Sequence, residues 1–426
     1  MTQLHISRVE LASPQEIGTL SLDNGAFAYS ETYLSSPNPV PLSASLPLRS
    51  QPFPEYAARP YFEGLLAEGP ARAQLAGALG VKEDDYLSLL EACGKDCIGD
   101  ILVSRQPPTV SRGEYRPLTF SDMRNLLSDS ANLAENNAAL RLSLAGTQGK
   151  TGLAHLPGHA NDSGWLQPSG IAATTHILKT SRMRDIPENE YLCMKAATAC
   201  GIETPHVELM DFPLPTLAVE RFDRKASLDV NGQLSVARLH QEDLAQALGM
   251  TPASKYAEVE RGTIPAIARF LKRCSVQPAR DVAAFARMLC FAYAIGDCDA
   301  HLKNYSVLIQ DAAHGAYRIK LAPAYDFVCT TVFPRFSRIL AMVIGGEREI
   351  DEVEPSTFNL LASDLGITKA ALQTLAWPIA ENLAKSIGAA GNGHSGTVLA
   401  STPYIADDLL EDMTPRIEVL KAFCER

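Results

Sequence analysis

One long apolar segment constrains this chain more than any other. Residues 279–295 are strongly apolar, so we expect them to form a buried helix at the centre of their domain. A dense polar loop follows at once, with the sequence Asp-Cys-Asp-Ala-His-Leu-Lys-Asn at residues 297–304. We call residues 297–304 the polar loop. The helix thus delivers a cluster of acidic, basic and amide side chains.

The spacing of polar groups in and after this loop suits phosphoryl transfer. Asp299 and Asn304 lie five residues apart, and Asp326 follows Asn304 by twenty-two residues. In such a site one carboxylate orients the attacking hydroxyl, while an amide and a second carboxylate hold Mg²⁺ on the ATP phosphates. A capped turn is the competing interpretation, because Asp and Asn often bond nearby backbone groups. The second Asp and the upstream segments favour phosphoryl transfer.

Two upstream segments add a glycine loop and a lysine. Residues 141–153 place glycines and small polar residues between two apolar stretches, so their backbone N–H groups could approach phosphates. They do not form a Walker A motif, and an ordinary hairpin is the alternative. Residues 177–179 predict a buried strand that ends in Lys179. Such a lysine either holds ATP phosphates or reaches solvent. Glu190 is a candidate partner for Lys179, with a solvated glutamate as the alternative.

A hinge and a helical region are expected next. Residues 217–224 predict a strand that leads into a second lobe, with an adenine held by backbone groups near Glu220 and Phe222. After Asp223 we expect mostly helix, including an amphipathic helix over 238–249. The other expected elements are helices at 263–272, 367–388 and 404–422 and a hairpin of residues 305–309 and 317–321.

The first 108 residues predict a small α+β module without catalytic features. Asn24-Gly25 marks a hairpin, and the proline-rich residues 36–60 predict an extended crossing. Helical spacing runs from Pro60 to Cys93, with Asp84-Asp85 capping its last helix. Docking or scaffolding is the simplest role for such a module.

Composition excludes several classes of protein. A net charge of −11 and a pI of about 5.4 make the chain a poor stand-alone nucleic-acid binder. Its nine cysteines are odd in number and lack CxxC pairs, which indicates reduced thiols and no zinc site. The sequence shows no leader peptide and no apolar stretch of about 18 residues, so we expect a cytoplasmic protein without a membrane partner.

Taken together, these motifs resemble the HipA family, the serine/threonine kinase toxins of bacterial toxin–antitoxin modules. The similar segments follow the family's order along nearly the whole chain. They are Ser45-Leu-Pro-Leu, Phe62-Glu-Gly-Leu-Leu-Ala-Glu-Gly, Ser143-Leu-Ala-Gly-Thr-Gln-Gly-Lys-Thr, Val219-Glu-Arg-Phe-Asp-Arg, Arg238-Leu-His-Gln-Glu-Asp, Asp299-Ala-His-Leu-Lys-Asn-Tyr-Ser and Leu321-Ala-Pro-Ala-Tyr-Asp-Phe.

The resemblance implies an α+β, two-lobed protein-kinase-like fold. It divides the chain into an N-terminal module at 1–108, a kinase N-lobe at 120–222 and a mainly helical C-lobe at 223–426. ATP and Mg²⁺ are the implied cofactors.

The resemblance also implies roles for single residues. Asp299 would be the catalytic base with Lys303 as a second catalytic residue, and Asn304 and Asp326 would bind Mg²⁺. Ser143 matches the serine that the family autophosphorylates, and a phosphate there would add close to two negative charges and eject the loop. The implied nucleotide-binding set is Ala145, Gly146, Thr147, Gln148, Gly149, Lys150, Lys179, Glu220, Arg221, Phe222, His301, Leu302, Lys303, Asn304, Tyr325 and Asp326.

The implied partners follow from the same family. Its substrates are aminoacyl-tRNA synthetases, notably the glutamyl enzyme, and its usual partner is a HipB-like helix-turn-helix antitoxin that binds operator DNA. Contact with that DNA would run mainly through the antitoxin. The chain departs from the family at Gly149, where glutamate is common, and this is expected to loosen the loop and alter ATP affinity. A small-molecule kinase and a catalytically silent corepressor that binds the antitoxin are the alternatives.

Overall fold

The structure, a computed structural model, divides the chain into two compact units. It describes residues 2–9, 14–107, 113–128, 137, 149–160, 162–181, 183, 185–212, 214–256, 262–310, 317–392 and 404–425. Unit 1 consists of Met1–Arg182, Met210–Ser254 and Val307–Arg318. Unit 2 consists of Met183–Leu209, Lys255–Ser306 and Ile319–Arg426. The three parts expected from the sequence, 1–108, 120–222 and 223–426, divide the chain differently and stay a prediction.

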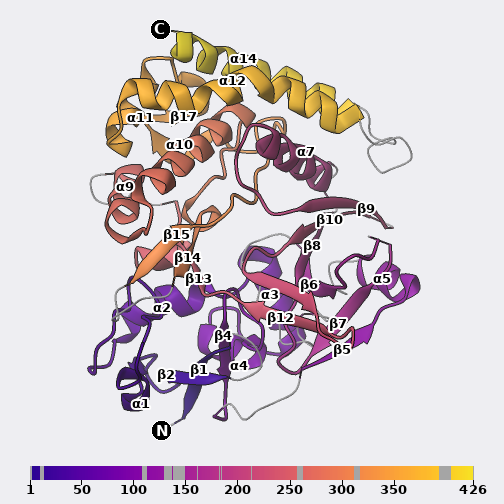
Figure 1. The fold of residues 1–426 in the computed structure, drawn as a ribbon, viewed down its shortest axis with the longest axis vertical. Coiled ribbons are helices and arrows are strands. Elements are labelled where there is room, and N and C mark those ends of the chain that lie inside the picture. Colours follow the sequence, from indigo (N-terminus) through magenta and orange to yellow (C-terminus); the bar gives the residue numbers. More distant parts are fainter. Residues whose placement is uncertain are drawn as a thin grey trace. The chain divides into compact units, whose positions relative to one another are not determined.

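Unit 1 begins with a four-stranded antiparallel sheet in the order β3-β2-β1-β4 (Figure 1). Its strands are β1 (Gln3–Arg8), β2 (Gln15–Ser21), β3 (Phe27–Tyr29) and β4 (Ile101–Ser104). The predicted hairpin at Asn24-Gly25 is confirmed, because β2 and β3 pair with Gly18 opposite Tyr29. Gly25 has a φ of +67°, a conformation that glycine adopts without strain.

Four helices pack with this sheet around an apolar core that includes Leu4, Phe27, Tyr61 and Leu90. They are α1 (Glu31–Leu34), α2 (Glu55–Gly64), α3 (Gly69–Leu79) and α4 (Tyr86–Cys93). The predicted cap is confirmed at Asp85, whose side chain accepts the N–H of Ser88 at 3.1 Å.

The predicted extended crossing up to residue 60 is wrong at its end. Helix α2 begins at Glu55, directly after Pro54, and contains Pro60. Proline at an interior position removes one backbone donor, which is why the sequence pattern favoured an extended chain. Pro60, Tyr61 and Phe62 are all buried in the module core, and this burial offsets the lost hydrogen bond.

A six-stranded sheet in the order β5-β7-β6-β8-β10-β9 follows. The buried strand predicted at residues 177–179 is confirmed as part of β8, and Leu178 belongs to a core with Met123, Leu153 and Trp165. The boundary between the units falls inside β9. The elements are β5 (Glu114–Pro117), α5 (Phe120–Leu126), β6 (Lys150–His155), β7 (Trp165–Ser169), β8 (His176–Thr180), β9 (Val207–Asp211) and β10 (Pro215–Glu220).

The helix predicted over residues 238–249 is largely wrong. Residues 224–238 form a hairpin of β11 (Arg224–Leu228) and β12 (Leu234–Arg238), closed by a turn in which Asp229 and Gln233 are hydrogen-bonded. Strand β13 (Gln241–Asp243) comes next, and α8 spans only Leu244–Ala247 before the short 3₁₀ helix η1 (Pro252–Ser254).

The predicted strands that deliver Asp326 are confirmed. They are β14 (Ser306–Gln310) and β15 (Arg318–Leu321), neighbours in a sheet of the order β13-β14-β15. The boundary between the units falls inside both β14 and β15.

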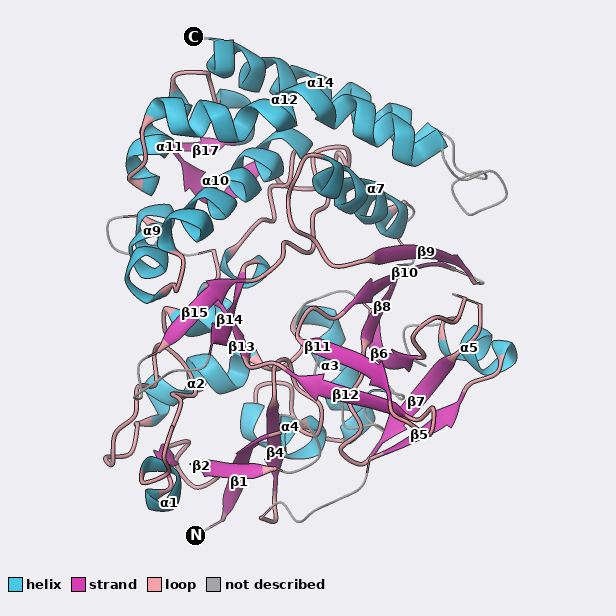
Figure 2. Ribbon diagram, in the orientation of Figure 1, coloured by secondary structure: helices cyan, strands magenta, loops and turns pink. Residues whose placement is uncertain are grey.

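Unit 2 is mainly helical and holds the apolar helix that precedes the polar loop (Figure 2). Helix α10 spans Pro278–Ile295, and every residue from Met288 to Ile295 is buried, so the predicted central helix is confirmed. The predicted helices near 263–272, 367–388 and 404–422 are also confirmed. The other elements are α7 (Ile186–Ala199), α9 (Thr263–Cys274), η2 (Leu302–Asn304), β16 (Ile339–Ile344), β17 (Glu347–Glu349), η4 (Ile350–Glu352), α11 (Thr357–Leu365), α12 (Lys369–Asn392) and α14 (Tyr404–Glu425).

Unit 1 thus combines sheets with short helices, whereas helices make up most of unit 2, and the predicted α+β class is confirmed. All nine cysteines are free thiols. Within the described ranges, no helix combines the length and the apolar character needed to cross a bilayer.

Candidate active site

Gly296 ends α10 and turns the chain into the polar loop. Its φ of +79° lies in the left-handed region, and a Cβ at this position would lie 2.0 Å from the Thr331 hydroxyl. The Gly296 carbonyl accepts hydrogen bonds from the backbone N–H and the hydroxyl of Thr330, at 3.1 and 2.9 Å. Glycine is therefore required here, and the turn is joined to the segment around Thr330.

The backbone of Asp299 organises the polar loop. Its carbonyl accepts the N–H of His301 at 2.7 Å and the amide Nδ2 of Asn304 at 3.2 Å. Because Asn304 donates through its nitrogen, its amide oxygen is the atom suited to a cation. The Asp299 side chain is exposed, whereas His301, Leu302 and Lys303 are buried. The carboxylate predicted to be the base thus faces solvent.

Asp326 lies on a segment that is bonded to the polar loop. The hydroxyl of Tyr325 donates to the carbonyl of Lys303 at 2.8 Å and lies 2.6 Å from the Ser306 hydroxyl. Asp326 itself has a φ of +63°, which is uncommon for a residue with a side chain. Such strain gathers at functional sites, so this conformation supports a role for the Asp326 carboxylate.

Asp297 is a third carboxylate, which the sequence analysis did not single out. Its side chain is only 3% exposed, and its Oδ1 accepts the N–H of Asp299 at 3.0 Å. Burial, followed by the negative charges of Asp299 and Asp326, raises the pKa of Asp297 well above its usual value. The three carboxyl groups therefore lie close together. The sequence signal for Asp297 was the Asp-x-Asp pair that it forms with Asp299 at the start of the polar loop.

This donor set fits Mg²⁺ that is bound together with phosphates. Mg²⁺ is usually held by one or two carboxylates plus phosphate oxygens and water rather than by a protein cage. In the described part of the chain, no cluster of three or more His, Cys, Asp or Glu side chains is arranged to bind a metal by itself. The Oδ2 of Asp297 is buried without a hydrogen-bond partner there, so the cluster carries uncompensated acceptor capacity.

Tyr256 contacts the predicted base. Its hydroxyl donates to Oδ1 of Asp299 at 2.6 Å, and its ring meets the ring of His301 edge-on with the ring centroids 5.2 Å apart. Tyr256 is 50% exposed. Its hydroxyl thus lies where an acceptor hydroxyl would bind the base. No motif marked this residue, because it lies 43 positions before Asp299.

Two lysines lie opposite each other in unit 1. Lys150 begins β6, Lys179 lies in β8, and the register of the two antiparallel strands pairs them directly. Directly opposed residues of an antiparallel pair project to the same face of the sheet. Lys179 is buried and Lys150 is half-buried. Two ammonium groups on one face suit a ligand with several negative charges, such as a chain of phosphates.

The other predicted nucleotide-binding residues of unit 1 are only partly described. Gly149 is described and accepts the N–H of Thr180 at 3.1 Å through its carbonyl. Glu220 is exposed at the end of β10, and Phe222 is half-buried. The predicted residues that lie outside the described part are Ser143, Ala145, Gly146, Thr147 and Gln148.

Arg221 belongs to a buried charge network in unit 1. Its guanidinium donates to Asp223 at 2.9 and 2.7 Å, and that of Arg224 donates to Asp223 at 2.8 Å and to Asp96 at 3.0 Å. Arg238 reaches Asp96 at 3.2 Å. Burial disfavours the charge on Asp96, but the three guanidinium groups outweigh it and hold the pKa of Asp96 well below its usual value. A contact of Arg221 with the nucleotide stays a prediction.

Glu242 is a buried carboxyl group with an unusual pKa. Its Oε1 accepts the N–H of Ala44 at 3.0 Å and the hydroxyl of Tyr317, while its Oε2 has no hydrogen-bond partner in the described ranges. Burial raises the pKa of Glu242 to about 7, against the lowering effect of these hydrogen bonds. The folded protein therefore favours the protonated form of Glu242.

Glu242→Gln is expected to stabilise the protein at alkaline pH. Folding raises the pKa of Glu242, so the protonated carboxyl group contributes to the free energy of unfolding. This contribution is complete below about pH 4.5 and is lost as pH rises through about 7. The corresponding free energy is on the order of 3 kcal/mol, and the amide avoids this loss because it never ionises. The measurement is chemical unfolding at pH 5 and pH 8. The free energy of unfolding of the variant relative to wild type should be higher at pH 8 than at pH 5. Glu83→Gln, at an exposed position, should show no such gain.

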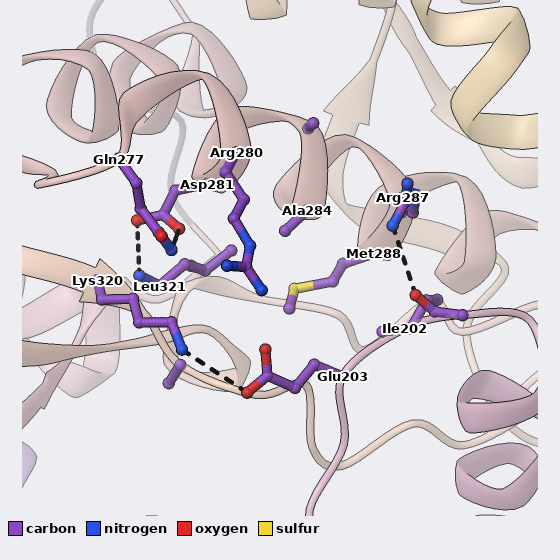
Figure 3. Close-up of a pocket in the computed structure, with 13 residues that line it drawn as sticks. Ile202, Glu203, Gln277, Arg280, Asp281, Ala284, Arg287, Met288, Lys320 and Leu321 are labelled. Carbon is purple, nitrogen blue, oxygen red and sulfur yellow. Dashed lines mark hydrogen bonds and ion pairs between the residues drawn. The ribbon is translucent and has the colours of Figure 1, made fainter.

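Unit 2 also contains a polar pocket of about 260 Å³ beside the first turns of α10 (Figure 3). Arg280 projects from α10 into it, and Lys320 pairs with Glu203 at 3.8 Å. Asp281 accepts the N–H of Leu321 at 2.9 Å and so fixes one wall. None of its lining residues belongs to the polar loop, so this pocket is separate from the candidate active site.

Two family models match the chain. The model of the HipA N-terminal domain matches residues 10–104, and that of the HipA-like C-terminal domain matches residues 142–388. The protein Y4mE of Sinorhizobium fredii is 36% identical over 359 residues, which cover 80% of each chain. The serine/threonine-protein kinase toxin HipA of Shewanella oneidensis is 26% identical over 426 residues, covering 96% of this chain and 93% of that protein.

A solved structure shows the same architecture. It is the complex of the Shewanella oneidensis HipA, HipB and its operator DNA, to which this chain is similar with a TM-score of 0.80 and 23% sequence identity. The match covers 99% of both chains. The protein therefore has the kinase-like fold of that structure along its whole described length.

Proposed function

Because the chain belongs to the HipA family, we propose that it is a serine/threonine protein kinase and the toxin of a toxin–antitoxin pair. The observation that carries this proposal is the joined framework of Asp299, Asn304 and Asp326 around the buried Asp297. The kinase-like fold and the relative named as a serine/threonine-protein kinase toxin support it.

The residues divide the chemistry between them. Bound MgATP would supply the phosphoryl group and the charge that Mg²⁺ neutralises. Asp299 accepts the proton of the acceptor hydroxyl, and the oxygens of Asn304 and Asp326 hold the metal ion. Lys179 and Lys150 hold phosphate oxygens. Lys303 is the second catalytic residue.

The remaining nucleotide contacts follow the family resemblance. Glu220 and Phe222 hold the adenine through their backbone groups. The glycine loop over residues 145–149, together with His301 and Tyr325, completes the phosphate side. Gly149 in place of the family's common glutamate gives this loop more backbone freedom.

We further propose that Ser143 is the site of self-inactivation. It lies two residues before the glycine loop that would cover the phosphates. A phosphate on Ser143 would add roughly 1.5 to 2 negative charges close to the phosphates of a bound nucleotide. The resulting repulsion would drive the loop away from its closed position.

The proposed partners are a HipB-like antitoxin and a protein of the translation machinery. A solved relative forms a complex with HipB and operator DNA, which supports the antitoxin. This chain has a net charge of −11, so we assign operator binding mainly to the antitoxin. The substrate we propose is an aminoacyl-tRNA synthetase such as the glutamyl enzyme, and the site of action is the cytoplasm.

The test of this function is phosphate transfer followed by mass spectrometry. The full chain is incubated with MgATP, alone and with purified aminoacyl-tRNA synthetases, and phosphopeptides are mapped. We expect one phosphate on Ser143 and one on a serine or threonine of a synthetase. Bound ATP without any phosphorylated protein would instead favour a small-molecule kinase. No ATP binding would favour a catalytically silent corepressor.

Asp326→Asn is expected to weaken the binding of MgATP by roughly tenfold to a hundredfold. The change keeps the shape of the side chain but removes one of the two proposed metal ligands and its charge. The measurement is the Kd of a fluorescent ATP analogue at saturating and at low Mg²⁺. Asp408→Asn, at an exposed position of α14, is the matched control. An unchanged Kd for Asp326→Asn at low Mg²⁺ would refute the metal assignment.

A further inference from the structure

A second pocket of unit 2 opens directly beside Asp299. Its volume is about 460 Å³, within the range of pockets that hold small ligands or side chains. It is formed by the polar loop, Thr330, the residues just before β16, both strands of the β16–β17 pair and Tyr256. The lining residues are Tyr256, Cys298, Asp299, Thr330, Phe336, Ser337, Ile339, Leu340, Ala341 and Arg348.

Large apolar side chains are exposed in this pocket. Ile339 is 52% exposed and Phe336 is 38% exposed, and the exposed ring of Tyr256 faces the same space. Single exposed apolar residues are common on protein surfaces, but a group of them around one cavity indicates a binding surface. Such a surface gains free energy when another apolar group displaces water from it.

The apolar wall is fixed relative to the predicted base. The backbone N–H of Ala341, in β16, donates to the carbonyl of Cys298 at 3.0 Å, and Cys298 N–H donates to the Thr330 hydroxyl at 2.9 Å. Arg338, directly before Ile339, forms a double ion pair with Asp351, with distances of 2.5 and 2.6 Å. A group in this pocket therefore lies at a set distance from the Asp299 carboxylate.

Apolar contact is the main interaction that this pocket offers to a bound group, because few of its lining residues are charged. The charged ones are Arg348 and Asp299, and the proposed reaction needs Asp299 as the base. The polar pocket at the first turns of α10 differs in this respect, because Arg280, Arg287 and Lys320 line it (Figure 3). An apolar side chain is therefore the group that the pocket beside Asp299 suits.

We propose that this pocket binds a bulky apolar side chain next to the serine or threonine that receives the phosphate. The inference rests on the proposed kinase function and names the kind of acceptor segment that it uses. Successive residues of an extended segment are about 3.3–3.6 Å apart, so the apolar residue lies one or two positions from the acceptor. The acceptor hydroxyl replaces that of Tyr256 on Asp299 as the segment binds.

The first arm of the test compares acceptor peptides. Serine peptides from a library, in which the two positions on either side of the serine are varied one at a time, are offered to the full-length protein with MgATP. We expect leucine, isoleucine, methionine or phenylalanine at one flanking position to raise kcat/KM about tenfold or more over aspartate or glycine there. If apolar residues, aspartate and glycine give the same kcat/KM at each of the four flanking positions, the proposal is overturned.

The second arm changes the pocket. Ile339→Asp should raise KM for the preferred peptide about tenfold or more and abolish the apolar preference, and Ile339→Ala should show a smaller rise. Leu360→Asp is the matched control, because Leu360 is 58% exposed on α11 and does not line the pocket. Unchanged peptide preference in Ile339→Asp would overturn the proposal.

Phosphorylation of the chain itself separates this inference from the proposed function. If the protein phosphorylates itself but no peptide of the library, recognition does not lie in the acceptor segment and the inference is wrong, while the kinase function stands. If neither the chain nor any peptide is phosphorylated while ATP is bound, the proposed kinase function fails and the inference fails with it.

Discussion

Asp299→Asn is expected to lower the rate of phosphoryl transfer by roughly 10²- to 10⁴-fold, the usual contribution of a general base. The amide has the shape of the carboxylate and can still accept the hydroxyl of Tyr256 through its oxygen. It cannot take a proton from the acceptor hydroxyl. Because the side chain is exposed, the free energy of unfolding should change by less than about 0.5 kcal/mol.

The measurement is single-turnover transfer to Ser143 and to the preferred acceptor, followed by phosphopeptide quantification. Asp408→Asn removes a carboxylate from an exposed helical position and should retain the wild-type rate. ATP affinity should stay within a fewfold of wild type, because the proposed metal ligands are intact. Full transfer activity in Asp299→Asn would remove Asp299 as the base.

Asp96→Ala is expected to destabilise the protein by about 3–5 kcal/mol. Asp96 accepts hydrogen bonds from Arg224 at 3.0 Å, Arg238 at 3.2 Å and the Thr174 hydroxyl at 2.7 Å, and it is 3% exposed. Removing one partner of a buried ion pair leaves the opposite charges without compensation, and this costs far more than the pair itself contributes. Here Asp223 would still pair with Arg221 and Arg224, but the buried guanidinium group of Arg238 would lose its ion pair with Asp96.

Urea unfolding of wild type, Asp96→Ala and Glu91→Ala measures this difference. Glu91 also pairs with an arginine, Arg105, but that arginine is exposed to solvent, so the loss of this ion pair should cost far less than the loss of Asp96. Asp96→Asn should fall between the two, because it keeps one hydrogen-bond acceptor. If Asp96→Ala and Glu91→Ala unfold at the same urea concentration, the network does not stabilise unit 1.

The proposed active site was predictable wherever it depends on local spacing. Asp299, Asn304 and the helix before them lie in one continuous segment, and the buried face of α10 follows from the apolar residues that recur along it. The strand that carries Lys179 was predictable for the same reason, because three consecutive residues indicated it. The pairing of Lys179 with Lys150 was not predictable, because it depends on the register between β6 and β8, two strands that are separated in the sequence.

The region after Asp223 shows how a local pattern misleads. Residues 238–249 have helical spacing, but the chain forms β12 and β13 before the four-residue helix α8. Before this segment, Asn231-Gly232 is a hairpin signal that speaks against the mostly helical region expected after Asp223. Arg224 and Arg238, paired across that hairpin, both form buried ion pairs with Asp96, and these contacts, which lie far away in the sequence, hold the two strands in place.

The sequence by itself determined the α+β class, the central helix and the order of the groups that resemble the HipA family, because all of these are written in short, continuous segments. Only the tertiary structure decided the burial of Asp297, the contact of Tyr256 with Asp299 and the apolar pocket at Ile339. Asp96 and Arg238 meet across 142 residues, and Tyr256 and Asp299 across 43. Contacts of this kind depend on how whole elements pack, which periodicity and spacing along the chain do not specify.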